Sequence, residues 1–329
     1  MLILTESDLR AALTMGDVID AVEHGFRALG HGNATIPERL RLDVPAHDGV
    51  LLEMPAYATF DGSGALGSKI VSVFPENARR GLAIVQSAYL LIDSETGVPL
   101  SLMDGKFITA IRTAATSAIA TRYMSSPGSK RLAVFGAGLQ SQFHIEAMTE
   151  VAEIEVVMIA SRSEKKARGL ADRIRKIHDL PCEIVTADQA AATANLICTC
   201  TSSPVPLFDG KLLSPGTHIN AVGAFTPSTR ELDTEAVRRA RVIIDSDSAA
   251  GRESGEILIP ITEGAIDEGH VKGTLADIVL SRIAGRESPA EITMFKSCGL
   301  AIEDLVTARL AYEKANVRGI GARIDMSGK

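Results

Sequence analysis

The sequence predicts an α/β protein with two parts, a Rossmann-type doubly wound parallel sheet and a second α+β domain. The first observation is that short apolar segments alternate with helical ones after residue 130, which is typical of a parallel sheet covered on both faces. The second is that residues 36–103 contain apolar runs separated by turn signals, which favours an antiparallel or mixed sheet. A chain of 329 residues is long enough for two such domains.

Local patterns predict the elements of the first part. Thr5 and Asp8 form a capping-box pattern before a short helix that reaches Leu13. A second helix begins at Asp17 and carries apolar residues every three or four positions until Gly30. Alternating or apolar runs then predict strands at 40–44, 50–54, 67–74 and 83–92, and an Ala- and Thr-rich segment predicts a helix over 104–124.

Six strands of the parallel sheet are predicted after that helix. They are Arg131–Phe135, Glu155–Ala160, Cys182–Val185, Leu196–Thr199, His218–Val222 and Val242–Asp245. Helical segments lie between most of these strands, as the crossover connections of a parallel sheet require. A last helix is predicted over roughly 297–316, and it could return to the first domain.

Composition restricts the partners and the compartment. Lys and Arg total 34 against 41 Asp and Glu, and this net charge of −7 disfavours a nucleic-acid-binding protein. No apolar run approaches the roughly 18 residues that span a bilayer, and the N-terminal segment lacks the pattern of a signal peptide. We therefore expect a cytoplasmic protein that binds neither nucleic acid nor membrane. The four cysteines and seven histidines show no metal-ligand spacing, so no metal site is expected.

A glycine motif predicts a bound dinucleotide. The strand ending at Phe135 is followed at once by the motif GAGLQS and then by a helix. Gly136 permits the tight turn, and Gly138 lets the backbone approach a pyrophosphate. Leu139 and Gln140 begin the helix, whose first N–H groups favour phosphate binding.

The end of the second strand indicates which dinucleotide is bound. An NAD site usually carries Asp or Glu there to hold the ribose hydroxyls. This chain instead has Ser161, Arg162 and Ser163, and Arg162 can form a forked pair with a 2′-phosphate. The pattern favours NADPH, with NADH as the alternative. Arg162 could equally be a solvated residue at the start of a helix.

Two cations stand in apolar surroundings in the first part. Lys69 lies within an apolar strand, and Arg112 lies in an Ala-rich helix, with no obvious local carboxylate near either. A charge in such surroundings needs a partner or marks a functional site. Two interpretations remain open from the pattern: structural ion pairs, or a site for an anionic ligand such as a carboxylate.

The chain resembles the ornithine cyclodeaminase/mu-crystallin family over nearly its whole length. The matching stretches are LEMPAY from Leu52, GSKIVSVFPEN around Lys69, DGKFITAIRTAATSAIAT around Arg112, GAGLQSQFH at the glycine motif and FKSCGLAIEDL from Phe295. The resemblance implies a substrate-binding and dimerisation domain of residues 1–115, to which residues 305–329 return. It also implies an NAD(P)-binding Rossmann domain of residues 116–304 and a homodimer.

The resemblance also implies a set of site residues. It places a substrate carboxylate on Arg39, Lys69 and Arg112, with Arg41 as a nearby rival of Arg39. It places the nicotinamide near Val222 and Gly223 and near Ser297 to Gly299. Thr201, just after the strand Leu196–Thr199, is also expected to bind the cofactor.

Two departures from the family pattern disfavour ornithine as substrate. Phe225 stands where the cyclodeaminases carry a catalytic Asp, and Phe can neither accept a proton nor hold an ammonium group. Glu53 directly precedes Met54, one place later than the corresponding acid of the cyclodeaminases. In a strand that shift turns the side chain to the other face.

We therefore expect a reductase of cyclic imino acids. The substrate would be Δ1-pyrroline-2-carboxylate, reduced to L-proline, or Δ1-piperideine-2-carboxylate, reduced to L-pipecolate; the sequence does not rank the two rings. Phe225 would pack near the ring, and Lys69, Thr226 and Ser228 are candidates for the proton donor. The alternatives are an L-alanine-type amino-acid dehydrogenase, an ornithine cyclodeaminase and a non-catalytic NADP(H)-binding protein.

Overall fold

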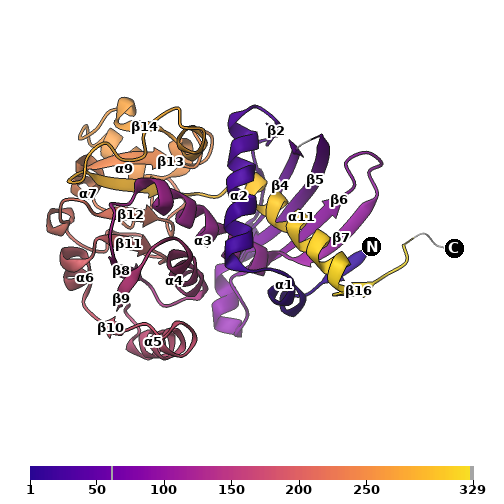
Figure 1. Cartoon of the computed structure of the whole chain (residues 1–329), viewed down its shortest axis with the longest axis horizontal. Coiled ribbons are helices and arrows are strands. Elements are labelled where there is room, and N and C mark those ends of the chain that lie inside the picture. The colour runs from indigo at the N-terminus through magenta and orange to yellow at the C-terminus, as the bar shows by residue number, and fades with distance from the viewer. Residues whose placement is uncertain (61, 327–329) are drawn as a thin grey trace. The chain divides into compact units, whose positions relative to one another are not determined.

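The computed structural model describes residues 1–60 and 62–326, and it divides into two compact units (Figure 1). One unit is Met1–Arg112 with Leu300–Lys329, and the other is Thr113–Gly299. The sequence places the two boundaries three to five residues later, at 115/116 and 304/305. The first boundary falls inside the continuous helix α3 (Gly105–Met124), where no Gly, Pro or change in composition marks it.

A mostly antiparallel sheet forms the centre of the first unit. Its order is β16-β1-β7-β6-β5-β4-β2, and β3 also pairs with β4. The strands are β1 (Leu2–Leu4), β2 (Ala34–Thr35), β3 (Leu40–Val44), β4 (Gly49–Phe60), β5 (Ser63–Val73), β6 (Val85–Ile92), β7 (Pro99–Asp104) and β16 (Ala322–Arg323). Because β1 runs parallel to β7, the sheet is mixed, and the predicted sheet type is confirmed. The short strands β1, β2, β7 and β16 were not predicted.

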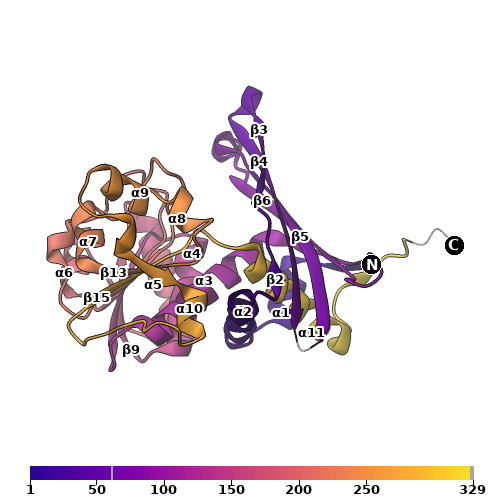
Figure 2. The same ribbon diagram turned by 90° about the horizontal axis from the view of Figure 1, so that it is seen from above.

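Three helices accompany this sheet: α1 (Glu6–Ala12), α2 (Met15–Gly30) and α11 (Ala301–Arg318). The predicted capping box is present, since the Thr5 side chain accepts from the Asp8 N–H and Asp8 from the Thr5 N–H. Helix α11 packs on α2, β4 and β5, so the end of the chain belongs to the first unit. Figure 2 shows α2 and α11 beside the same sheet.

One row of this sheet is fully buried. Met54, Lys69, Tyr89 and Met103 are cross-strand neighbours on β4, β5, β6 and β7, and each is less than 8% exposed. Cross-strand neighbours share a face of a sheet, so Lys69 lies on the buried face. The next residue, Ile70, points to the opposite face and is 48% exposed.

The second unit contains an eight-stranded sheet in which every pair is parallel. Its order is β10-β9-β8-β11-β12-β15-β13-β14. The strands are β8 (Lys130–Phe135), β9 (Ile154–Ala160), β10 (Cys182–Ile184), β11 (Leu196–Thr199), β12 (His218–Ala221), β13 (Ala240–Ile244), β14 (Val271–Thr274) and β15 (Ile292–Lys296). Since the order reverses between β8 and β11, the sheet is doubly wound, and the predicted Rossmann-type fold is confirmed.

Most connections of this sheet contain α-helices, whereas β11 and β12 are joined by a loop with one short 3-10 turn at Gly210–Leu212. The helices are α4 (Leu139–Val151), α5 (Glu164–His178), α6 (Ala187–Thr193), α7 (Thr234–Arg239), α8 (Ala250–Glu253), α9 (Gly255–Thr262) and α10 (Leu275–Val279). All six predicted strands are present, but β14 and β15 were missed. β15 lies between β12 and β13, which are consecutive strands of the sequence, so no local pattern could give its place.

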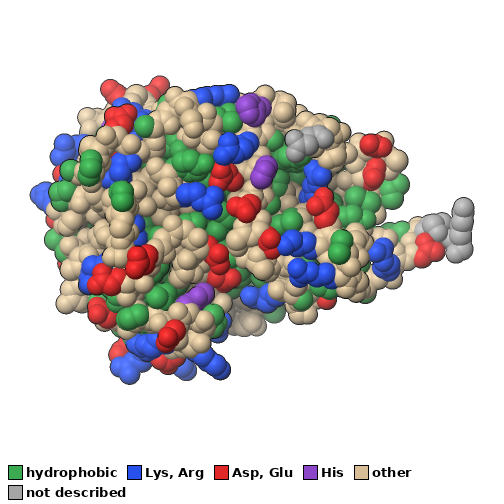
Figure 3. All heavy atoms as spheres, in the orientation of Figure 1, with side chains coloured by type: hydrophobic (Ala, Val, Ile, Leu, Met, Phe, Trp, Pro, Cys, Tyr) green, Lys and Arg blue, Asp and Glu red, His purple; other side chains and the backbone are tan. Residues whose placement is uncertain are grey.

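The surface carries no extended region of one charge on the face shown in Figure 3, where acidic and basic side chains are interspersed. Among the helices within residues 1–60 and 62–326, none combines the length and the apolar character needed to cross a membrane.

Candidate functional site

The glycine turn after β8 is built as the motif requires. Gly136 has φ +103°, a conformation that L side chains rarely adopt, and its N–H donates to Ala160 O at 2.8 Å. A Cβ atom at this position would lie 2.7 Å from Cys200 O. Glycine is therefore needed here both for the backbone angle and for the close approach to the next strand.

The space above the start of α4 is open. Gly138 is the N-cap residue and no side-chain hydrogen bond caps the helix; a Cβ atom on it would meet nothing within 4 Å. The Gly138 N–H donates to Ser141 Oγ at 3.3 Å. Helix α4 thus presents backbone N–H groups and the positive end of its dipole to this space, an arrangement that fits a phosphate.

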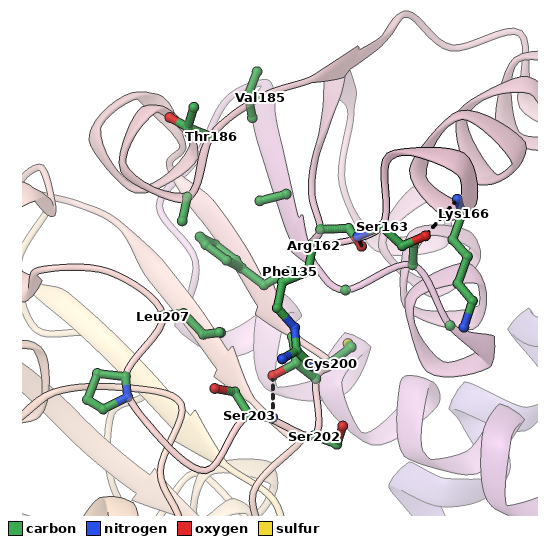
Figure 4. A pocket seen from close by; sticks show the side chains of 18 residues that line it. Phe135, Arg162, Ser163, Lys166, Val185, Thr186, Cys200, Ser202, Ser203 and Leu207 are labelled. Atoms are coloured by element: carbon green, nitrogen blue, oxygen red, sulfur yellow. Dashed lines mark hydrogen bonds between the residues drawn. The ribbon is translucent and has the colours of Figure 1, made fainter. Parts of the chain in front are cut away.

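A cavity of about 640 Å³ adjoins the turn (Figure 4). Six of the predicted cofactor residues line it: Gly136, Gly138, Ser161, Arg162, Ser163 and Thr201. No lining residue is acidic, and the two basic ones are Arg162 and Lys166. The volume, the glycine turn and the cations together fit a dinucleotide.

Other predicted cofactor residues lie outside the lining of this cavity. They are Leu139, Gln140, Val222, Gly223, Ser297 and Gly299. Leu139 and Gln140 form the first turn of α4, and the remaining four follow the carboxyl ends of β12 and β15. Lys166 was missed, although it lies one helical turn after Ser163, the N-cap of α5, and its spacing could have indicated it.

The two buried cations of the first unit are paired with carboxylates. Lys69 Nζ donates to Asp304 Oδ2 at 2.7 Å. Arg112 Nε donates to Asp304 Oδ1 at 2.9 Å, and its Nη1 donates to Glu303 Oε2 at 2.7 Å. All four side chains are at most 5% exposed. The partners are not local in sequence: they come from α11, about 190 to 235 positions along the chain. The ion pairs that the sequence left open as one interpretation are therefore present.

This cluster of Lys69, Arg112, Glu303 and Asp304 contains two positive and two negative charges. Burial lowers the pKa of Lys69 to about 8, although the attraction of Asp304 opposes the shift. Burial alone would raise the pKa of Asp304, but attraction by Arg112 and Lys69 holds it below its usual value. Lys69 can therefore gain and lose a proton near neutral pH, while Asp304 remains ionised.

Tyr89 adds a polar group beside this cluster that the sequence did not indicate. It is the cross-strand neighbour of Lys69, and it is 1% exposed. Its hydroxyl has no hydrogen-bond partner among the described residues. A buried hydroxyl without a partner is unusual in a folded protein, and it is consistent with a bound polar molecule at this place.

The remaining predicted residues lie in loops or at strand ends. Arg39 is half-buried just before β3, while its rival Arg41 pairs with Asp43 at 2.7 Å on an exposed part of that strand. Phe225 is 51% exposed in the loop after β12. In the same loop, the Thr226 and Thr229 hydroxyls share a hydrogen bond of 2.7 Å.

The parallel sheet and its glycine turn define a Rossmann-type dinucleotide-binding protein. The chain belongs to the ornithine cyclodeaminase/mu-crystallin family, whose model matches residues 1–319, and the resemblance seen in the sequence is confirmed. A Delta(1)-pyrroline-2-carboxylate reductase of Bacillus cereus is 36% identical over 327 residues, covering 99% of this chain and 100% of the relative.

Two solved structures are similar over almost the full length. Thermococcus litoralis Delta(1)-pyrroline-2-carboxylate reductase, in complex with NADH and L-proline, is 42% identical with a TM-score of 0.95, covering 98% of this chain and 100% of that one. An archaeal alanine dehydrogenase dimer with bound NAD is 32% identical with a TM-score of 0.93, covering 99% of each chain.

Proposed function

We propose that this protein is an NAD(P)H-dependent reductase of cyclic imino acids that converts Δ1-pyrroline-2-carboxylate to L-proline. One observation carries the proposal. The chain has two buried cations, Lys69 and Arg112. It also matches, over nearly its full length, a reductase whose solved structure contains NADH and L-proline. L-proline is the product of the proposed reaction, and its carboxylate is the group that two cations would hold.

Arg112 and Lys69, assisted by Arg39, hold the substrate carboxylate. A guanidinium fork suits the planar carboxylate, and an ammonium group provides a point contact. Asp304 and Glu303 keep both cations in position and compensate for their charge before substrate binds. Holding the carboxylate fixes the ring so that its C=N carbon has one defined orientation.

Reduction of the C=N bond adds a hydride to carbon and a proton to nitrogen. The reduced nicotinamide supplies the hydride when it is bound. Lys69 supplies the proton, either directly or through water, since its lowered pKa of about 8 leaves a proton that can be released near neutral pH. Thr226 is a weaker candidate, because its hydroxyl already shares a hydrogen bond with Thr229.

The residues that line the cavity at the corner between β9 and α5 favour NADPH over NADH. Arg162 and Lys166 supply two positive charges, while Ser161 and Ser163 supply hydroxyl groups. Figure 4 shows Arg162 extending into the cavity. A 2′-phosphate would interact favourably with this set, whereas a carboxylate that could hold two ribose hydroxyls is missing from the cavity lining.

The first unit also favours a homodimer. The exposed side of its sheet carries large apolar side chains at Leu40, Leu42, Tyr57, Ile70 and Leu102, each between 37% and 56% exposed. An exposed apolar surface on a sheet is typical of a protein interface. A similar alanine dehydrogenase is a dimer in its solved structure, which supports the same state here.

The similarity to alanine dehydrogenases makes amination of pyruvate the second candidate. The test follows the loss of NADPH absorbance with the purified protein and Δ1-pyrroline-2-carboxylate. Parallel reactions contain pyruvate with ammonia, and ornithine with NAD⁺. Rapid oxidation with the cyclic imine alone is the expected result. Turnover only with pyruvate and ammonia would replace the proposal, and ammonia release from ornithine would contradict the role given to Phe225.

A further inference from the structure

A buried carboxylate joins two loops at the carboxyl edge of the parallel sheet. Glu231 is fully buried, and its Oε1 accepts hydrogen bonds from the Thr201 N–H at 2.7 Å and the Thr201 hydroxyl at 2.6 Å. Its Oε2 accepts from the Gly223 N–H at 2.7 Å. Thr201 follows β11 and Gly223 follows β12, which are adjacent strands. One side chain therefore fixes the distance between the two loops.

The two loops are also in close contact with each other. A Cβ atom at Gly223 would lie 2.1 Å from Thr201 O and 2.6 Å from Glu231 Oε1. The lack of space is what requires glycine here. The backbone angle is not the reason, because Gly223 does not adopt a left-handed conformation. Glu231, Thr201 and Gly223 are therefore packed together without room for a further atom between them.

Glu231 is itself held by a second buried carboxylate. Its backbone N–H donates to Glu256 Oε1 at 2.8 Å. Glu256 Oε2 lies 3.3 Å from Lys296 Nζ, and Lys296 donates to Ala224 O. Lys296 ends β15, so the chain of contacts connects the carboxyl ends of β11, β12 and β15. Burying these charges is costly, and the hydrogen bonds to loops offset part of that cost.

This edge of the sheet is where a dinucleotide binds in open α/β folds. Thr201 lines the cavity, whereas Glu231 does not. We propose that Glu231 is a positioning residue for the cofactor, because it holds the Thr201 and Gly223 loops in the arrangement that the nicotinamide half requires. This inference rests on the proposed function. The competing explanation is that Glu231 only stabilises the fold.

The substitution Glu231→Gln keeps the contact to Thr201 and removes the contact to Gly223. The amide oxygen can still accept from Thr201, but the amide nitrogen would then face the Gly223 N–H, and two donors cannot bond to each other. Glu231→Asp keeps the charge and withdraws both oxygens by one methylene. If the position of the carboxylate oxygens matters, and not only their charge, neither variant holds the Thr201 and Gly223 loops as Glu231 does.

Asp233→Asn is the matched control. Asp233 also joins two segments, since it accepts from the Gly210 N–H at 2.9 Å and the Ala236 N–H at 2.8 Å. Neither Gly210 nor Ala236 lines the cavity. The control therefore removes an equivalent carboxylate from the same segment of chain, away from the proposed cofactor site.

Binding of NADPH is measured by fluorescence titration without substrate, together with hydrogen exchange at the amides of residues 200–203 and 222–224. We expect both Glu231 variants to bind about tenfold more weakly, with faster exchange in these loops, and Asp233→Asn to bind within about twofold of wild type. Equal weakening in all three variants, or wild-type affinity in the Glu231 variants, would overturn the inference. Failure of the wild-type protein to bind any nicotinamide dinucleotide would instead refute the proposed function.

A Glu231→Gln chain that does not fold leaves Glu231→Asp as the deciding variant. Folding is checked by the unfolding temperature and by exchange in β8 and β9, which lie outside the two loops that Glu231 joins. Wild-type NADPH affinity in a folded Glu231→Asp protein would show that charge at this position is sufficient, and it would contradict the positioning role.

Discussion

Asp304 is the residue that holds the charged cluster of the first unit together. It accepts hydrogen bonds from both Lys69 and Arg112, and it is fully buried. Removing one partner of a buried ion pair leaves the other charge unpaired in a medium of low polarity. The two cations therefore depend on Asp304 for their position and for the energy of their charged states.

We expect Asp304→Asn to destabilise the protein by about 3–5 kcal/mol, because Lys69 and Arg112 lose a common counter-charge. Imine reduction should fall by at least about tenfold, since the pKa of Lys69 then drops further and its ammonium form becomes scarce. Urea unfolding and initial rates measure the two effects. Asp43→Asn is the control, because its pair with Arg41 is exposed and contributes about 0–1 kcal/mol. Unchanged stability in Asp304→Asn would contradict the ion-pair assignment.

We expect Lys69 to give the proposed reaction a pH dependence. Four groups face it: Asp304, Glu303, Arg112 and the Tyr89 hydroxyl. As a proton donor, Lys69 must be protonated, so kcat/KM should fall as the pH rises through about 8. In the Lys69→Arg variant the guanidinium remains protonated across this range. The fall of kcat/KM near pH 8 should therefore be absent, whatever the absolute rate of the variant. An identical fall in both proteins would mean that the substrate, and not Lys69, titrates.

The same shift affects stability in a defined direction. The pKa of Lys69 is lowered from 10.5 to about 8 in the folded protein, so between these values the unfolded chain binds more protons. Its contribution to the free energy of unfolding therefore rises with pH across this interval. Below about pH 8 both states are protonated, and the contribution becomes constant and unfavourable.

Among the elements, we expect the corner between β9 and α5 to set the choice of dinucleotide. β9 ends at Ala160, Ser163 caps α5, and Arg162 and Lys166 line the cavity from this corner. The helix continues with more basic residues, including Lys165, which does not line the cavity. Position on the corner, and not the net charge of the helix, should therefore control specificity.

Arg162→Ala should lower kcat/KM for NADPH by about tenfold or more and leave the value for NADH nearly unchanged, because a forked contact to the 2′-phosphate is lost. The ratio of the two values, measured by steady-state kinetics, reports the effect. Lys165→Ala provides the comparison and should keep the wild-type ratio. A fall of equal size with both dinucleotides would assign Arg162 to the shared part of the cofactor.

Local patterns predicted most elements, while long-range pairing escaped them. The glycine motif and the Thr5 capping box depend on residues a few positions apart, so the sequence is sufficient for both. The insertion of β15 between β12 and β13 depends on contacts between distant segments. The same limit explains the cluster around Lys69, whose partner Asp304 is 235 positions away.

Each of the two units carries one part of the proposed chemistry. The unit of residues 113–299 contains the cavity beside the glycine turn, and the other unit contains the charged cluster. The second unit's sheet is parallel throughout, whereas the first unit's sheet leaves an apolar side exposed. This exposed apolar side is the surface on which we expect the homodimer to form.

The proposed homodimer can be tested on that apolar side. Ile70→Lys places a charge among exposed apolar residues, so it should convert a dimer to a monomer, since an unpaired charge in an interface is costly. Val317→Lys, on α11 at a position 89% exposed, should leave the dimer intact. Light scattering coupled to size-exclusion chromatography gives the masses. A monomeric wild-type protein, or a dimeric Ile70→Lys protein, would contradict this interface.

In the proposed reaction, hydride passes from the dinucleotide to the C=N carbon of a cyclic imino acid. The most direct measurement uses NADPH deuterated at the transferred position of C4, with Δ1-pyrroline-2-carboxylate as the only substrate, and analyses the product by mass spectrometry and NMR. We predict L-proline that carries one deuterium at the carbon next to the carboxylate, with one molecule formed for each dinucleotide oxidised. Oxidation without labelled proline, or no oxidation of either dinucleotide, would contradict this reaction.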